Sequence, residues 1–260
     1  LFVRKFSVTA AALAAAVTIS AAPASATIAS IAVYNQVITG STMRWVRTPA
    51  GTGGDLYTIS SSSGSSPGAA TVNFSFLNPT LNALGALAAT LTVNATSSQP
   101  AVPISSFLTE QGLTGTFAFT YAGATPLTVG QTSYATGANL LSGTFTNGTI
   151  VGATGGRTGT FSASTGAGSV ITMFSDFLDF SAAGNLDLTI GLSSMTAPLG
   201  ASSAQSALNT FRAATGGSFS SDSALLTAAI PEPASWALMV TGFGAMGVAV
   251  RRRRKATVTA

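Results

Sequence analysis

The chain of 260 residues has only 7% charged side chains, and it contains no histidine and no cysteine. Residues 27–230 hold four arginines and six acids, a net charge of −2, because the remaining cations lie near the two ends. This composition excludes disulfides, Cys-His and Ser-His-Asp catalysis and a zinc site, and four scattered arginines argue against nucleic-acid binding.

The first 26 residues predict a signal peptide. A short basic start with Arg4 precedes an uncharged, alanine-rich run, and Pro23 then ends any helix. Ala24 and Ala26 stand where a signal peptidase reads small residues. The apolar run is too short to span a membrane comfortably, so we expect export through the Sec translocon and cleavage of this segment.

Residues 27–215 predict an all-β domain, either an antiparallel β-sandwich or a jelly-roll-like body. Short stretches that alternate β-branched or aromatic residues with small polar ones are typical of strands between turns. They lie at Thr71–Leu77, Thr90–Ala95, Gly115–Tyr121, Ser142–Thr146, Thr149–Ala153, Gly159–Ala163, Ser169–Phe174 and Leu186–Leu192.

Other local signals mark turns, loops and one helix. Asn147-Gly148 predicts a type I′ hairpin, and Gly155-Gly156 predicts the turn of the next one. Ser60–Pro67 is a serine-rich patch typical of a flexible surface loop. Ser202–Ala214 is the only plausible helix. The Ser/Gly/Ala-rich residues 216–230 predict a flexible spacer.

Carboxylates are the remaining candidates for chemistry in the body. Asp176, Asp179 and Asp187 lie close together in the sequence. Residues three apart on a strand point to opposite faces, which argues against a catalytic pair. The three could contribute oxygen ligands to Ca²⁺, although no EF-hand loop is present. We favour the interpretation that they are solvated turn and edge-strand acids, with no metal and no cofactor.

Trp45 is the only tryptophan of residues 27–230 and stands between Arg44 and Arg47. An exposed tryptophan beside arginine could stack on a sugar ring. A tryptophan in a strand is more often buried, and this second alternative is favoured.

The C-terminal residues 231–255 predict a membrane-spanning tail. Pro231 and Pro233 hold a short strip extended. Residues 234–250 are uncharged and would form a helix about 25 Å long, close to the thickness of a bilayer core. Five cations follow at 251–255, and moving them through the membrane would cost more than about 12 kcal/mol. We therefore expect them in the cytoplasm and the body outside.

These residues together resemble the PEP-CTERM sorting signal in its PEPxxWA form, although a plain single-span anchor is the alternative. The residues that carry the resemblance are Pro231, Glu232, Pro233, Trp236, Ala237, Gly242, Gly244, Gly247, Arg251, Arg252, Arg253 and Arg254. The resemblance covers this tail alone. It implies an exosortase, a membrane-embedded cysteine peptidase or transpeptidase, as partner, and a Gram-negative bacterium that makes exopolysaccharide.

Three functional hypotheses remain. The first is a non-enzymatic surface or biofilm-matrix protein that is held at the inner membrane and then released to the cell surface or medium by an exosortase. The second is a carbohydrate-binding module for exopolysaccharide. The third is a carboxylate-dependent hydrolase that uses the acids named above.

Overall fold

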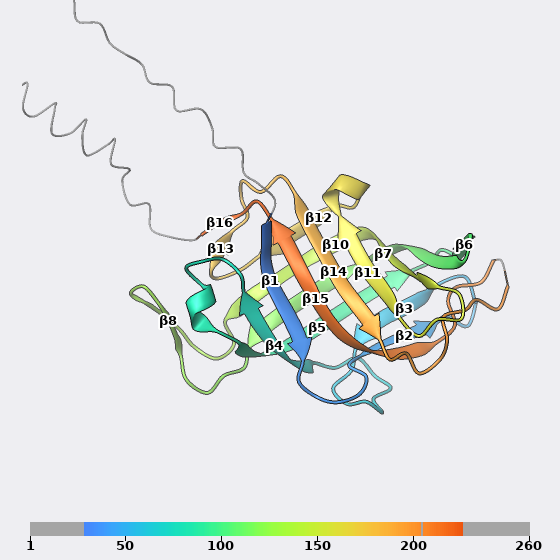
Figure 1. Ribbon diagram of the computed structural model, residues 1–260, viewed down its shortest axis with the longest axis horizontal. Coiled ribbons are helices and arrows are strands. Elements are labelled where there is room, and N and C mark those ends of the chain that lie inside the picture. Colours follow the sequence, from blue (N-terminus) through green and yellow to red (C-terminus); the bar gives the residue numbers. More distant parts are fainter. Residues whose placement is uncertain (1–28, 204, 226–260) are drawn as a thin grey trace, which may run out of the picture.

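The computed structural model describes residues 29–203 and 205–225, which form an antiparallel β body (Figure 1). No α-helix occurs in these residues. The elements are β1 (Ala29–Gln36), β2 (Met43–Arg47), β3 (Gly54–Thr58), β4 (Ala70–Phe76), η1 (Asn82–Leu84), β5 (Leu87–Ser97), β6 (Val102–Ile104), β7 (Phe107–Tyr121), β8 (Leu127–Val129), β9 (Thr132–Tyr134), β10 (Asn139–Ala153), β11 (Gly159–Ser164), η2 (Thr165–Ala167), β12 (Ile171–Phe174), β13 (Leu178–Asp179), β14 (Leu186–Ser193), β15 (Phe211–Ser221) and β16 (Ala224–Leu225).

The sequence pattern explains these strands. In β4 and β5 every second residue is buried, and the residues between them are exposed or half-buried. Successive side chains of a strand point to opposite faces, so one face packs into the core and the other meets water. Apolar residues, mainly alanine, valine, leucine and phenylalanine, fill most of the buried positions, and threonine is common on the other face; β-branched and aromatic residues suit such a pleated, half-buried surface.

Twelve strands belong to one sheet, and its pairing returns to its starting point. The order β1-β4-β5-β7-β10-β11-β14-β15 closes because β15 also pairs with β1. β15 pairs with β2 through its first residues, and β5 pairs with β3 through its last ones. The antiparallel all-β prediction is therefore confirmed. A single closed sheet replaces the two separate sheets of a sandwich or jelly roll, because the β5–β7 and β1–β15 pairings join its strands into one ring.

Aromatic side chains fill the space inside this sheet. Phe119 from β7 lies at its centre, with ring-centroid distances of 4.9 Å to Tyr34, 5.0 Å to Phe74 and 5.3 Å to Phe219. These four side chains come from four different strands and are all buried. Each large aromatic removes much apolar surface from water, so the cluster ties together strands that are distant in the sequence.

Each of the eight predicted stretches overlaps a strand, but the hairpin predicted at Asn147-Gly148 is wrong. Both residues lie inside β10, where the pairing with β7 shifts register between Phe145 and Gly148. Asn147 has a φ of 55°, the left-handed conformation that asparagine tolerates well. The dipeptide therefore forms a β-bulge. The turn predicted at Gly155-Gly156 is confirmed between β10 and β11.

The predicted helix Ser202–Ala214 is wrong throughout its described residues, and the spacer predicted from Gly216 is wrong where it overlaps β15. This strand lies between β14 on one side and β1 and β2 on the other. A Cβ on Gly217 would lie 2.4 Å from the carbonyl oxygen of Thr189, so glycine is needed for close packing. The body thus extends to Leu225 in β16, beyond the predicted boundary at 215.

Candidate functional site

The two terminal predictions lie outside the described residues. These are the signal peptide with Ala24 and Ala26, and the tail with its motif and the helix 234–250. Within residues 29–203 and 205–225 no helix has the length and apolar character needed to cross a membrane. The described chain ends at Leu225, and Pro231 follows after five residues.

Trp45 is fully buried, so the sugar-stacking interpretation of this residue is wrong. Its indole N–H donates a hydrogen bond of 2.9 Å to the carbonyl oxygen of Leu208. The backbone N–H of Leu208 is bonded as well, and it donates to Glu110 Oε2 at 2.9 Å. Trp45 and Glu110 therefore hold the backbone at Leu208 against the sheet.

Glu110 is a buried acid that sequence reasoning missed. Its side chain is fully buried on β7, and Oε1 has no hydrogen-bond partner within the described residues. Burial raises the pKa of the carboxyl group to about 7, because the charged form loses its water, although the Leu208 N–H opposes this. A single glutamate in a β stretch carries no sequence signal for such burial.

Two of the three predicted acids accept backbone N–H groups. Asp176 Oδ2 accepts the Asn139 N–H at 2.7 Å. Asp179 Oδ1 accepts the Ser181 N–H at 2.8 Å, and this hydrogen bond lowers the pKa of Asp179. Asp187 lies on β14 opposite Ser220. The three lie toward the same end of the body, but no group of three or more acids in the described part of the chain is close enough together to hold a metal ion.

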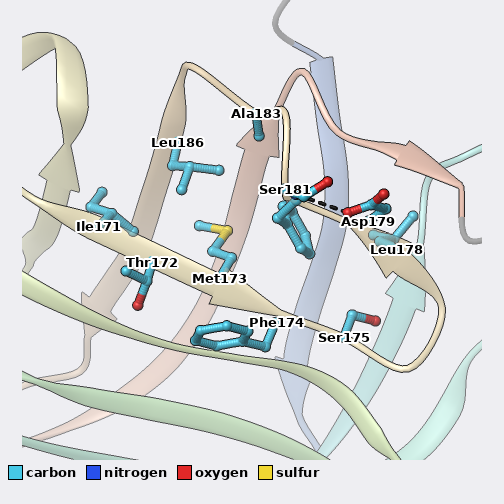
Figure 2. A pocket seen from close by; sticks show the side chains of 11 residues that line it. Ile171, Thr172, Met173, Phe174, Ser175, Leu178, Asp179, Ser181, Ala183 and Leu186 are labelled. Atoms are coloured by element: carbon cyan, nitrogen blue, oxygen red, sulfur yellow. Dashed lines mark hydrogen bonds between the residues drawn. The ribbon is translucent and has the colours of Figure 1, made fainter.

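An open groove of about 440 Å³ lies beside β12 (Figure 2). Its floor is apolar and buried, with Ile171, Met173 and Leu186, and Phe174 stands 60% exposed at its edge. Asp179 is the only carboxylate among the residues that line this groove, and Asp176 is not one of them. Glycoside hydrolysis requires two carboxyl groups that flank the glycosidic bond, and this groove does not supply such a pair.

The structure gathers the four arginines of the body at one end, which corrects the prediction that they are scattered. Arg44 and Arg212 are direct cross-strand partners. Arg157 Nη1 donates to the carbonyl oxygens of Met195 and Thr196. The N–H of Thr196 in turn donates to the carbonyl oxygen of Arg212, which links these two arginines. Arg47 donates to the hydroxyl of Ser202. The name arginine end is used below for these four side chains around residues 195–212.

Two of these arginines hold the serine-rich loop. Arg44 Nη1 donates to the carbonyl oxygen of Ser65 at 2.7 Å, and Arg212 donates to those of Ser63 and Gly64 at 3.2–3.4 Å. The predicted surface loop at 60–67 is confirmed in position, since most of its residues are exposed. Its backbone is nevertheless fastened to β2 and β15.

Acids gather at the opposite end of the sheet. β14 and β15 pair from Leu186 opposite Ser221 to Ser193 opposite Ala214, so Asp187 and Asp222 lie far along these strands from Arg212. Asp179 pairs with Ala224 of β16. Figure 1 shows β13 and β16 beside the start of β1, away from β2 and β3. Four acids thus lie where the described chain begins and ends: Asp176, Asp179, Asp187 and Asp222.

The fold and the tail together define an exported all-β protein with a C-terminal sorting signal. A family model described as the PEP-CTERM protein-sorting motif matches residues 229–254, which confirms the resemblance drawn from the tail. This motif indicates export and sorting toward the cell surface by an exosortase. No curated protein and no solved structure matches the chain.

Proposed function

We propose that this chain is a non-enzymatic surface or extracellular-matrix protein that an exosortase releases from the inner membrane and that associates with exopolysaccharide. The sorting motif at 229–254 carries the proposal. The predicted signal peptide would deliver the body across the membrane, and the tail would hold it there until processing.

The acids of the body support a structural rather than a catalytic role. Asp176 and Asp179 accept backbone N–H groups, and Asp222 accepts those of Gly184 and Asn185 at 3.0 and 3.3 Å. Carboxylates used in this way fix loops, and none stands with a second carboxylate in the groove beside β12. This arrangement favours the matrix hypothesis over the hydrolase.

The position of β16 sharpens the sorting hypothesis. Leu225 pairs with Leu178, so the folded body continues to five residues before Pro231. An extended chain of that length reaches about 20 Å at most. The Pro-Glu-Pro strip can therefore lie no farther than this from Leu225 at the acidic end of the body.

Processing in cells tests the proposal. A tag placed after Ala260 should separate from the body in cells that contain the exosortase and stay joined in cells that lack it. A matched variant, Glu232→Gln, keeps both prolines and removes the charge between them. It tests whether the exosortase recognises the carboxylate of this strip. If tag and body remain on one polypeptide in both strains, the tail acts as a permanent anchor and the proposal is wrong.

A further inference from the structure

We propose that the arginine end is a binding surface for an acidic polysaccharide, with a sugar ring on Phe107 and carboxylate groups on the neighbouring arginines. The inference rests on the proposed association with exopolysaccharide and adds the chemistry of that ligand and its place on the body.

Charge segregation is the first observation. Of the six acids in the body, only Asp55 and the buried Glu110 share the end that holds all four arginines. The hydrogen-bond partners of the four guanidinium groups are backbone carbonyls and one hydroxyl, and none is a carboxylate. No carboxylate of the described residues hydrogen-bonds to these groups, and four cations against two acids would attract an anion to this end.

The second observation is an exposed aromatic beside these charges. Phe107 is 48% exposed and pairs with Ala153 of β10, just before the turn that carries Arg157. A shallow groove of about 460 Å³ joins Phe107 to Gly152, Thr158 and Thr160. An aromatic face with hydroxyl groups along its side suits a sugar ring, whose C–H face packs on the ring while its hydroxyls form hydrogen bonds.

Neighbouring exposed hydroxyls extend this surface. Ser202, Ser203 and Thr210 are exposed beside Arg47, and the serines of the 60–67 loop lie beside Arg44 and Arg212. Nucleic acids are the less suitable polyanion, because they bind through many closely spaced phosphate contacts and this end offers four cations. A polysaccharide with spaced carboxylates needs fewer contacts and uses the hydroxyls.

The topology places this surface at the opposite end of the body from the two ends of the described chain. β10 pairs with Phe174 through Ser142 and with Phe107 through Ala153, so the two exposed phenylalanines lie at opposite ends of one long strand. The described chain begins and ends at the Phe174 end, where Ala29 lies opposite Ser221. A body held by its C-terminal tail would therefore present Phe107 and the arginines outward.

Binding of soluble polymers to the purified full chain in detergent tests the inference. The probes are alginate as a carboxylated polysaccharide, dextran as a neutral one and double-stranded DNA as another polyanion. We expect alginate to bind at 50 mM salt, weaken steeply toward 500 mM, and exceed both dextran and DNA. Phe107→Ala and Arg157→Gln should each weaken alginate binding about fivefold. The triple variant that adds Arg47→Gln should weaken it by more than about 20-fold.

Matched variants at the other end separate this surface from general charge effects. Phe174→Ala removes a comparably exposed phenylalanine, and Ala182→Glu at the exposed acidic end lowers the net charge by one, as Arg157→Gln does; neither should weaken alginate binding. Arg157→Lys should keep most of the affinity. Far-UV circular dichroism checks that each variant folds.

Three results would overturn the inference: no alginate binding at low salt, equal losses in the Phe107 and Phe174 variants, or tighter binding of DNA than of alginate. Tag release in cells does not depend on this surface. A chain that is processed but does not bind alginate would refute the binding surface and leave the proposed sorting intact.

Discussion

Glu110→Gln tests whether the buried carboxyl group makes folding depend on pH. In the folded chain the pKa of Glu110 rises from its ordinary value of 4.5 to about 7, and burial is the main cause. Above pH 4.5 the unfolded chain loses this proton while the folded chain keeps it. The free energy of unfolding should therefore fall as pH rises from 4.5 to 7 and level off above that.

The size of the effect follows from the pKa change. One pKa unit corresponds to 1.36 kcal/mol, so ionising Glu110 costs the folded state about 3 kcal/mol at pH 8 relative to pH 4.5. Glutamine has the same shape and no charge, and its carbonyl oxygen can still accept the Leu208 N–H. The variant should match the parent chain within about 1 kcal/mol at pH 4.5 and exceed its stability by about 3 kcal/mol at pH 8.

Urea unfolding of residues 27–230 at a series of pH values measures this difference. Trp45 is the only tryptophan of that segment, and its contact with Leu208 makes its fluorescence a direct report on the region that Glu110 holds. Asp179→Asn is the control, because the pKa of Asp179 is lowered and its titration lies below this range. A stability difference between parent and Glu110→Gln that stays constant from pH 4.5 to 8 would refute the reasoning.

Further predictions address packing and the fastened loop. Gly217→Ala should destabilise the body by about 3 kcal/mol, because its Cβ would lie 2.4 Å from the carbonyl oxygen of Thr189. Gly191→Ala is the control and should cost less than about 1 kcal/mol, because the nearest atom to its Cβ would be 3.5 Å away. Thermal unfolding compares the two variants. Trp45→Phe should cost about 2 kcal/mol by urea unfolding, followed by circular dichroism, because it leaves the Leu208 carbonyl buried without its donor, and no loss would contradict that role. Arg212→Ala should make the 60–67 loop sensitive to proteinase K while the rest of the sheet resists, and an unchanged digestion pattern would show that Arg44 alone suffices to hold it.

Local alternation in the sequence was sufficient to predict the antiparallel strands. β4, β5 and β14 follow their burial pattern closely, since a period of two is visible in any stretch that buries one face. β15 escaped because Gly216 and Gly217 give it the composition of a linker. Its identity as a strand comes from its pairing with β14 and with β1, which is distant in the sequence, and both pairings require close approach of backbones.

The same limit applies to the candidate sites. The sorting tail could be predicted because its residues are contiguous and their order is specific. The arginine end could not, because Arg44 and Arg212 are separated by 168 positions of sequence and meet only through the pairing of β2 with β15. Trp45 was correctly expected to be buried, but its bond to Leu208 depends on a loop that the sequence had suggested as a helix.

The mass of the released protein is the most direct measurement of the central claim. In cells that contain the exosortase, intact mass spectrometry of the extracellular protein should find a chain that starts near Thr27 and ends near Pro231-Glu232-Pro233, without the helix 234–250 and the cations at 251–255. A matched strain without the enzyme should keep the whole tail in its membrane fraction. A released protein that retains residues 234–255, or an identical processed mass in both strains, would contradict sorting by an exosortase.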